Sequence, residues 1–310
     1  MKEPKVFSLN ISEEKGAIKN PVQKVFFDKK GIVGDAHAGS WHRQVSLLAK
    51  ERIDVFSKEE KKNIKPGEFA ENITTQGIDL SGVSLLDRFK IGPVLLEVVQ
   101  IGKKCHGRSC AIFQEIGRCV MPKEGIFCRV LKGGQIRIND PINYIPQELN
   151  IKIITLSDRA SLGEYEDKSG PKIAELLEKF FQGRPWKIKL SRVLIPDSKS
   201  RLLQEIRKIK KDKPEIVFTT GGTGIGAKDI TPDVIKPLLK LELPGIMDFI
   251  RLKYGKNNPR ALISRSLSGV LGESLIFVLP GSEKAIVEYM AEIVKILEHS
   301  IFMQKNINIH

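Results

Sequence analysis

The sequence predicts two domains: a mainly-β, barrel-like domain over residues 1–148, then a three-layer α/β/α domain with a mostly parallel sheet over residues 149–310. Three observations support this fold class. The chain has 310 residues, which is enough for two separate cores. Its first half consists of short segments rich in Val, Ile and Phe. From Ile151 onward, strand-sized and helix-sized segments alternate.

The short segments of the first half are separated mostly by Gly, Asn, Asp or Pro, as expected for antiparallel strands joined by turns. They span residues 5–12, 22–28, 69–75, 89–102, 125–131 and 134–138. One helix is expected over residues 46–59, because Leu47, Leu48, Ile53 and Phe56 recur there with polar residues between them. Residues 140–150 contain two prolines without periodicity and are expected to link the domains.

The second half alternates between strands and helices. The expected strands are 151–157, 187–195, 215–220 and 274–280, and the expected helices are 170–181, 198–210 and 283–301. Such alternation is typical of parallel strands joined by crossover helices. Ligands of parallel sheets bind at the carboxyl ends of the strands, so this edge is where a site is expected.

The composition indicates a soluble globular protein that favours anionic partners. Apolar residues make up 41% and charged residues 28%, and the formal net charge is +14, spread over both halves. No apolar run approaches the roughly 20 residues of a membrane helix, and the N-terminus lacks a signal-peptide-like stretch, so we expect a cytoplasmic protein. Aromatic residues are sparse and no nucleic-acid motif occurs. Small phosphorylated molecules are therefore the expected partners, rather than nucleic acid or membrane.

A glycine-rich loop follows the expected strand 215–220. The stretch TTGGTGIGAKDITPD, residues 219–233, contains four glycines, whose backbone N–H groups can turn inward to bind an anion. It lacks the Gly-Lys-Ser/Thr of a Walker A motif and the Gly-x-Gly-x-x-Gly of a dinucleotide fold. A glycine-rich turn is about as often structural as ligand-binding, so the loop alone does not decide the function.

Acidic residues follow the ends of three expected strands. Asp158 follows strand 151–157, Asp197 follows strand 187–195, and Asp229 closes the glycine loop. Because these strands are parallel, their carboxylates should converge on one crevice, which suits a phosphate together with a divalent metal. For Asp197, the N-cap of the following helix is an equally good interpretation.

Six segments of the second half carry a family resemblance by their order and spacing. They read SDRASLGEYEDKSGP, LIPD, TTGGTGIGAKDITPD, LPGIMDFIR, LISRSLSGV and LPGS. Together they resemble the MogA/MoaB molybdopterin-binding family over residues 151–300, and the SDRAS opening is more similar to MogA. The resemblance implies a molybdopterin adenylyltransferase, which converts ATP and molybdopterin into adenylyl-molybdopterin and pyrophosphate with Mg²⁺. It also implies a homotrimer.

The resemblance implies roles for individual residues. Asp197 and Asp229 are the candidates for catalysis and for holding Mg²⁺. The candidates for binding the pterin phosphate and ring are Thr220, Gly221, Gly222, Thr223 and Gly224, with Ser264 and Ser274 as further pterin contacts. The candidates on the nucleotide side are Asp158, Ser169 and Gly170. Lys228 stands where the family often has arginine, and a lysine keeps the charge but lacks the bidentate fork.

All four cysteines lie between residues 105 and 128. Cys105 has basic neighbours, which favour the thiolate, and Cys110 follows five residues later. The segments GDAHAGSWHRQVSLL, PGEFAENITTQGIDLSG and IGKKCHGRSCAI resemble the MOSC domain, a β-barrel family, over residues 1–145. The resemblance implies that this domain binds molybdenum cofactor or carries sulfur on Cys105 or Cys110.

Other interpretations of the first half remain open. A zinc site could use Cys105, Cys110, His37, His42 and His106, although their spacing is no known zinc pattern. Cys128 is expected to fill core, and Cys119 is undecided. The side chains of His37 and Arg43 could contact an anion, or could be satisfied loop residues.

We therefore expect a fused enzyme of molybdenum cofactor biosynthesis. The alternative is a non-catalytic carrier that delivers finished cofactor to molybdoenzymes or to other cofactor-biosynthesis proteins. Two carboxylates beside a phosphate site favour catalysis with a metal over simple anion binding. Nucleic-acid binding driven by the positive charge is a third possibility that no motif supports.

Overall fold

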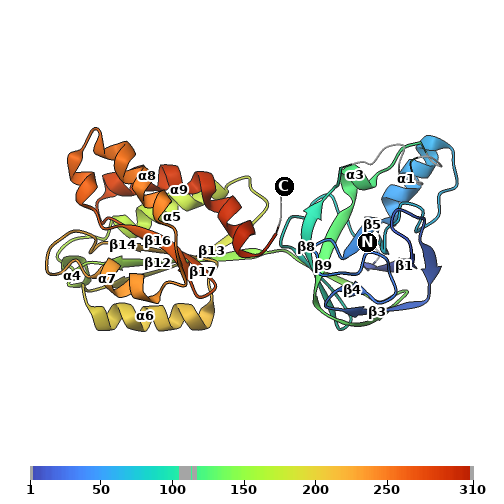
Figure 1. Ribbon diagram of the computed structural model, residues 1–310, viewed down its shortest axis with the longest axis horizontal. Coiled ribbons are helices and arrows are strands. Elements are labelled where there is room, and N and C mark those ends of the chain that lie inside the picture. The colour runs from blue at the N-terminus through green and yellow to red at the C-terminus, as the bar shows by residue number, and fades with distance from the viewer. Residues whose placement is uncertain (1–2, 105–112, 114–116, 308–310) are drawn as a thin grey trace. The chain divides into compact units, whose positions relative to one another are not determined.

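The computed structural model of the chain describes residues 3–104, 113 and 117–307 (Figure 1). These residues form two compact units. The N-terminal unit comprises the described residues up to Gln147 together with Ile307, and the C-terminal unit comprises Glu148–Asn306. Each unit has its own apolar core.

Two sheets make up the N-terminal unit. The larger sheet has the strand order β11 (Ile142–Ile145), β7 (Arg88–Ile91), β8 (Val94–Ile101), β9 (Ile126–Lys132), β5 (Val45–Ala49), β6 (Ile73–Gln76), β1 (Lys5–Ile11) and β2 (Asn20–Val22). The smaller sheet has the order β10 (Gly134–Arg137), β3 (Lys24–Asp28) and β4 (Gly31–Ile32). Among these described pairs only β5 and β6 are parallel. The expected mainly antiparallel architecture is confirmed, while closure into a barrel stays a prediction.

The helix expected over residues 46–59 starts too early. Val45–Ala49 form strand β5, in which every residue is buried, and helix α1 spans Lys50–Glu60 with Ile53 and Phe56 buried. Because successive side chains of a strand point to opposite faces and every residue of β5 is buried, both faces of the strand are covered and its apolar residues need not alternate. The apolar residues Leu47 and Leu48 of this strand, together with Ile53 and Phe56 of α1, therefore fit a helical spacing that is not present. Helix α1 is the crossover between the parallel strands β5 and β6.

Residues 140–150, expected as a linker without regular structure, contain the boundary between the two units but are mostly strand. Ile142–Ile145 form strand β11, which pairs with β7, and strand β12 (Glu148–Leu156) begins three residues later. Ile142 is buried, and the Tyr144 ring packs against the Phe89 ring with centroids 5.6 Å apart. These contacts come from the neighbouring strand, so periodicity within the segment could not reveal them.

The C-terminal unit contains a six-stranded mixed sheet. Its order is β13 (Lys187–Ile195), β12, β14 (Ile216–Thr220), β17 (Ser274–Leu279), β16 (Leu267–Leu271) and β15 (Leu241–Glu242). The first four strands are parallel. Strand β16 runs antiparallel to β17, and β15 runs antiparallel to β16 and thus in the direction of the first four. The registers bring the carboxyl ends of the four parallel strands to one edge, as expected.

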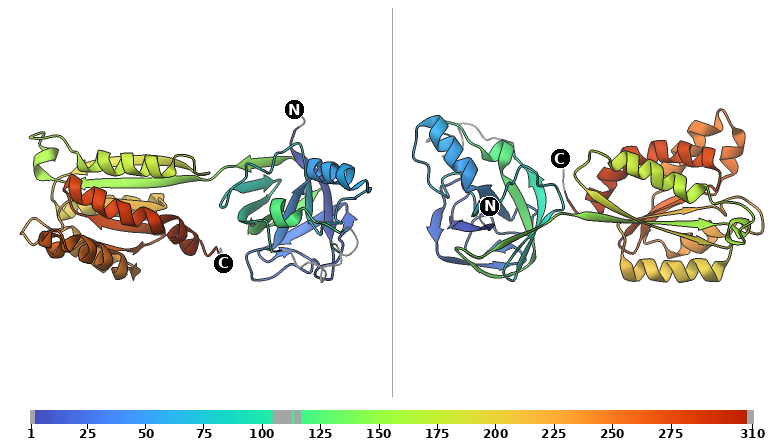
Figure 2. Two further views of the ribbon diagram at one scale, coloured as in Figure 1. Left: turned by 90° about the horizontal axis from the view of Figure 1, so that it is seen from above. Right: turned by 180° about the vertical axis from the view of Figure 1, so that it is seen from behind.

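Helices cover both faces of this sheet (Figures 1 and 2). Helices α6 (Lys199–Asp212) and α7 (Thr231–Ile235) lie on one face and share an apolar cluster with it. Helices α5 (Ser169–Phe181), α8 (Pro244–Gly255) and α9 (Glu283–Gln304) lie on the other, with α5 in contact with α9 (Figure 1). Shorter elements are α3 (Met121–Glu124), α4 (Asp158–Ser161), η2 (Lys236–Leu238) and η3 (Pro259–Ile263). Among the described residues, no helix combines the length and apolar character that a membrane span requires.

Candidate functional site

A cavity of about 310 Å³ lies at the carboxyl edge of the C-terminal sheet. Its lining comes from the ends of β12, β13 and β14 and from the turn before α9. Of the residues singled out in the sequence, the cavity brings together Asp158, Asp197, Asp229, Lys228, Ser169 and Gly222. The acidic residues therefore converge although 71 positions separate the first from the last.

The glycine loop is shaped by close backbone contacts. Gly221 and Gly222 have φ values of +101° and +62°, in the region that side chains disfavour. A Cβ on Gly221 would lie 2.2 Å from the carbonyl oxygen of Leu156. A Cβ on Gly222 would lie 2.6 Å from Oγ1 of Thr231, which donates a 2.9 Å hydrogen bond to the Gly221 carbonyl. Glycine is thus required at both positions for the loop to approach β12 and α7.

Asp229 closes the loop on itself. Its Oδ2 accepts a 2.8 Å hydrogen bond from the Gly226 N–H. A Cβ on Gly224 would lie only 2.7 Å from the same oxygen. The position of this carboxylate therefore depends on the absence of a side chain at residue 224.

Asp197 and Asp158 bind each other's main chain. The Asp158 N–H donates to Asp197 Oδ2 at 3.0 Å, and the Asp197 N–H donates to Asp158 Oδ1 at 2.9 Å. The alternative role of Asp197, as the N-cap of the helix after it, is wrong. Ser198 is the N-cap residue of α6, which has no side-chain capping bond, and Asp197 instead satisfies the first amide of α4.

Lys228 and the acidic groups set the electrostatics of the cavity. Lys228 Nζ lies 2.6 Å from Asp158 Oδ2, and this contact lowers the pKa of Asp158 and raises that of Lys228. Burial raises the pKa of Asp197, and the negative charges of Asp158 and Asp229 raise it further. The cavity thus holds several carboxylates whose mutual repulsion a bound cation would relieve.

Several candidates lie outside this cavity. Of residues 220–224, Gly222 lines it, whereas the Thr220 hydroxyl is buried and donates a 2.8 Å hydrogen bond to the Pro280 carbonyl. Ser264 does not line it, and its hydroxyl pairs with that of Ser266 at 2.7 Å. Gly170 packs too closely for a side chain, because a Cβ there would lie 2.7 Å from Thr155 Oγ1.

Ser274 is a wrong prediction. It begins strand β17, so it lies at the amino end of the parallel strands, opposite the edge that holds the cavity. Its register partner is Leu271 at the far end of β16, and its hydroxyl is buried. The chain reverses between β16 and β17, and this hairpin carries Ser274 away from the site.

Two residues that hold the site together were missed in the sequence. Arg265 donates from Nε to the Gly224 carbonyl at 2.7 Å, from Nη2 to the Asp229 carbonyl, and from Nη1 to the Asp233 carboxylate at 2.8 Å. Asp167 accepts from the Ser169 and Gly170 N–H groups at 2.9 and 3.1 Å. An Asp two residues before a helix start is a capping signal. Arg265 lies within the segment LISRSLSGV, but no local pattern predicts its contacts, since its partners lie more than 30 residues away.

The N-terminal unit contains a buried polar network beneath the GDAHAGSWHRQ segment. The side chains of Lys19 and Asp35 are fully buried and form an ion pair. Burial alone would raise the pKa of Asp35. Hydrogen bonds from His37 and Lys19 outweigh this effect and hold the pKa below its usual range. The Asn72 amide donates to Asp35 at 3.0 Å, and the His37 ring nitrogen Nδ1 lies 3.4 Å from the Lys19 ammonium. These contacts with Asp35 and Lys19 fix the position of the His37 ring.

Above this network lies a cationic and aromatic cluster. The Arg43 guanidinium lies 5.0 Å from the centroid of the Trp41 ring, and the Lys15 ammonium lies 5.7 Å from it. The Trp41 and His37 rings are stacked with centroids 6.3 Å apart. Within the described part of the chain, the buried Nε of Arg43 has no hydrogen-bond partner. This cluster has the composition of an anion-binding surface.

Two of the four cysteines, Cys119 and Cys128, lie within the described residues. Cys105 and Cys110, and with them His106 of the zinc alternative, lie outside the described residues. Cys128 is fully buried in β9, where burial raises the pKa of its thiol, so its role as a core residue is confirmed. Cys119 is half-buried and packs against an apolar cluster around α1.

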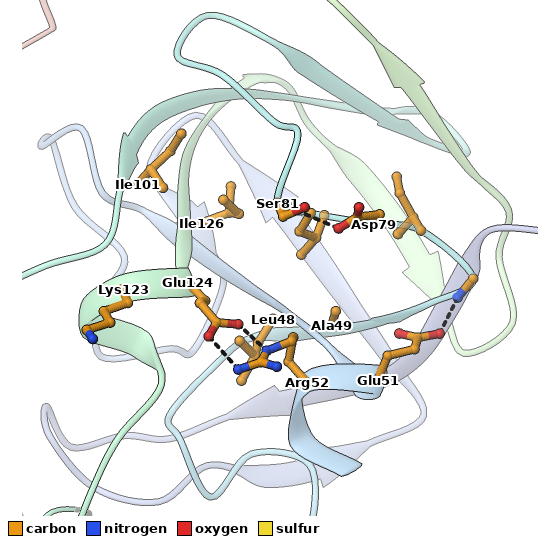
Figure 3. Close-up of a pocket in the computed structure, with 13 residues that line it drawn as sticks. Leu48, Ala49, Glu51, Arg52, Asp79, Ser81, Ile101, Lys123, Glu124 and Ile126 are labelled. Atoms are coloured by element: carbon orange, nitrogen blue, oxygen red, sulfur yellow. Dashed lines mark hydrogen bonds and ion pairs between the residues drawn. The ribbon is translucent and has the colours of Figure 1, made fainter. Parts of the chain in front are cut away.

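A second cavity, of about 750 Å³, lies in the N-terminal unit beside α1 and α3 (Figure 3). Its floor is apolar, with Leu48 and Ile126, and charged residues line its rim. Arg52 forms a two-pronged ion pair with Glu124, and Glu51 accepts from the Gly77 N–H at 2.8 Å (Figure 3). The charges of Arg52, Glu124 and Glu51 on this rim therefore already have partners.

Comparison with known proteins agrees with this architecture. The model of the "Probable molybdopterin binding domain" family matches residues 152–299, and the MOSC domain model matches residues 34–143. Over 143 residues the chain is 34% identical to the molybdopterin adenylyltransferase of Helicobacter pylori (strain J99), a match that covers 46% of this chain and 80% of that protein. The chain belongs to the MogA/MoaB family of molybdopterin-binding proteins. Both family resemblances are thereby confirmed.

Two further relatives show how far the likeness extends. The Drosophila melanogaster molybdenum cofactor synthesis protein cinnamon is 33% identical over 158 residues, which cover 51% of this chain and 26% of cinnamon. The chain thus spans about a quarter of that relative's length. The crystal structure of the tungsten cofactor synthesizing protein MoaB from Pyrococcus furiosus is 30% identical and covers 52% of this chain and 99% of its own, with a TM-score of 0.45.

The acidic cavity of this MogA/MoaB-family chain fits a magnesium ion held jointly with a substrate. The described residues contain no group of three or more His, Cys, Asp or Glu side chains arranged to hold a metal. Magnesium, however, is usually bound by one or two carboxylates plus phosphate oxygens and water. Asp229 and Asp197, whose Oδ1 faces Gly222, offer such carboxylates. Burial and the acidic neighbours of Asp197 raise the pKa of its carboxyl group, so a bound cation would stabilise its charged form.

Proposed function

We propose that the C-terminal unit adenylylates molybdopterin with Mg–ATP, and that the N-terminal unit binds the cofactor or carries sulfur on a cysteine. One observation carries the first half of the proposal. Three carboxylates from separate elements, Asp158, Asp197 and Asp229, surround one cavity beside a glycine loop. Such a cavity can receive the reacting phosphates of two molecules if a cation offsets their charge.

The proposed reaction is a nucleotidyl transfer. A terminal phosphate oxygen of molybdopterin attacks the α-phosphorus of ATP, and a new P–O bond forms there. The bond to the bridging oxygen breaks, and pyrophosphate leaves with that oxygen and its electron pair. No oxidant or reductant is needed. Magnesium, when bound, would offset the negative charge of the phosphates.

The residues of the cavity have distinct parts in this proposal. Asp197 and Asp229 orient the reactants and hold the metal. The N–H groups around Gly222 bind the pterin phosphate. Lys228, now paired with Asp158, contributes positive charge once a substrate competes for it. Holding the reacting atoms in line supplies most of the expected rate enhancement.

The alternative function is a non-catalytic carrier that binds finished cofactor and delivers it to molybdoenzymes. A pyrophosphate-release assay with molybdopterin, Mg²⁺ and ATP separates the two. Wild type should release pyrophosphate, and Asp229→Asn should bind the pterin but release at least about 100-fold less. Asp212→Asn, an exposed carboxylate of α6 outside the cavity, is the control. Pterin binding without any release by wild type would establish the carrier.

The proposal for the N-terminal unit rests on the cluster of Arg43, Trp41 and Lys15, which favours an anionic ligand such as the cofactor phosphate. Arg43→Ala should weaken cofactor binding by about 10-fold or more. For sulfur transfer, mass spectrometry after incubation with a sulfur donor should find one added sulfur on Cys105 or Cys110. Cys119→Ser should leave this addition intact. A chain that stays unmodified would exclude the sulfur carrier.

The family resemblance also suggests a homotrimer, which light scattering of the purified protein would test. Molybdoenzymes or other cofactor-biosynthesis proteins remain the expected protein partners under either function.

A further inference from the structure

Among the residues that the structure describes, no carboxylate offsets the charge of one cation in the acidic cavity. Its lining includes two positively charged residues, Arg159 and Lys228. Lys228 is paired with Asp158 at 2.6 Å. Arg159, in the first turn of α4, forms no ion pair with any residue that the structure describes. Three carboxylates line the same cavity, so Arg159 is the group best able to attract a polyphosphate.

Arg159 lies against an aromatic ring. Its guanidinium carbon is 5.1 Å from the centroid of the Tyr165 ring, which also lines the cavity. A guanidinium over an aromatic face is held by the ring while its N–H groups stay available at its edge. Those N–H groups match the oxygens of a phosphate in pairs.

The Tyr165 hydroxyl contacts a side chain of the same segment. It lies 3.0 Å from Oγ of Ser157, which also accepts from the Ala160 N–H as the N-cap of α4. The chain folds back after α4, where Gly163 has a φ of +77° and the Glu164 N–H donates to the Arg159 carbonyl at 3.0 Å. The segment from Ser157 to Tyr165 is therefore a preorganised support for the arginine.

The position of Arg159 indicates which part of a nucleotide it meets. Gly222 and Asp229 are half-buried, whereas Arg159, which lines the same cavity, is exposed to solvent. The group that leaves in an adenylyl transfer carries two phosphates and has to depart toward solvent. We propose that Arg159 binds the β- and γ-phosphates of ATP, which leave as pyrophosphate, and that Tyr165 is a positioning residue for its guanidinium. This inference rests on the proposed adenylyl transfer.

The test is calorimetric titration of the full chain with inorganic pyrophosphate and with adenosine monophosphate, both in the presence of Mg²⁺. Arg159→Ala should weaken pyrophosphate binding by about 10- to 100-fold and change binding of the monophosphate by less than about twofold. Arg159→Lys should fall between, because it keeps the charge and loses the fork. Arg201→Ala, an exposed arginine of α6, is the matched control.

Tyr165 has its own pair of variants. Tyr165→Phe keeps the ring but loses the contact with Ser157, so it should weaken pyrophosphate binding less than Tyr165→Leu, which should weaken it by about threefold or more. Equal effects of both variants would exclude positioning by the ring. An unchanged pyrophosphate affinity in Arg159→Ala, or an equal loss for both ligands, would overturn the main proposal.

The failure of this proposal can be told apart from failure of the proposed function. If pyrophosphate binding depends on Arg159 but wild type releases none from ATP and molybdopterin, the site stands and the transferase reaction is refuted. If wild type releases pyrophosphate and Arg159→Ala alters neither binding nor the KM for ATP, the reaction stands and the role of Arg159 is refuted.

Discussion

Asp158 and Asp197 exchange hydrogen bonds, each carboxylate accepting from the other's main-chain N–H group, at 3.0 and 2.9 Å. The pair ties the carboxyl end of β12 to that of β13, two strands that are neighbours in the sheet. Each residue still directs an oxygen elsewhere: Asp158 Oδ2 to Lys228, and Asp197 Oδ1 toward Gly222. The same two side chains therefore shape the edge of the sheet and supply charge to the cavity.

Asp197→Asn should stabilise the protein at neutral pH while reducing its activity. Burial and two like charges raise the pKa of Asp197, so the native state holds a proton on it more readily than the unfolded chain. Stability contributed by this group therefore falls as pH rises from about 4 through the folded pKa. Asparagine keeps an oxygen for the Asp158 N–H and removes the charge, so the gain at pH 7 should be up to about 1 kcal/mol.

Thermal denaturation between pH 4 and pH 8 measures this effect, with the exposed Glu166→Gln as control. The difference between Asp197→Asn and wild type should shrink as the pH approaches 4. A variant that is less stable than wild type at pH 7 would contradict the conclusion that the negative charge of Asp197 destabilises the folded protein.

Gly224→Ala should displace the carboxylate of Asp229. The added Cβ would lie 2.7 Å from Asp229 Oδ2, closer than such contacts occur. Because reacting groups have to be held within a fraction of an ångström, pyrophosphate release should fall by about 10- to 100-fold. Gly245→Ala, whose Cβ meets no atom within 4 Å, is the matched control and should stay within about twofold of wild type. Equal activity of the two variants would show that Asp229 is not held by the loop.

Arg265→Ala should loosen the glycine loop. The guanidinium binds the carbonyls of Gly224 and Asp229 and the carboxylate of Asp233, and alanine leaves all three without this donor. We expect a loss of about 1–3 kcal/mol in the free energy of unfolding, together with faster amide hydrogen exchange in residues 221–229. Arg192→Ala on β13 should change neither quantity. Unchanged exchange in the loop would refute the role of Arg265.

Lys19→Met should destabilise the N-terminal unit strongly. It leaves the fully buried carboxylate of Asp35 without its ion-pair partner, at a cost of about 3–5 kcal/mol. The double variant Lys19→Met/Asp35→Asn should recover part of that loss, because no unpaired charge remains buried. Urea denaturation in a Trp186→Phe background checks this, since the remaining Trp41 reports the N-terminal unit. A double variant less stable than Lys19→Met alone would contradict this explanation.

The site could be predicted only in part. Asp158, Asp197 and Asp229 were found because each follows a strand-like segment, and parallel strands end at a common edge. Ser274 was misplaced because it begins the expected strand 274–280, and the amino ends of parallel strands lie at the edge opposite the site. The contact between Lys228 and Asp158 and the loop contacts of Arg265 join residues 30 to 70 positions apart, which no local pattern encodes.

The amino-acid order alone determined the two fold classes, the glycine loop and the family, since these depend on local periodicity, turn residues and short motifs. Strand β5, hidden within a helix-like run, and β11, within an apparent linker, were decided by their neighbours in the sheet. Only the tertiary structure decided that Lys228 of the cavity forms an ion pair with Asp158, whereas Arg159 forms none with the described residues. That outcome depends on side chains meeting across strands, and such meetings are set by packing rather than by sequence proximity.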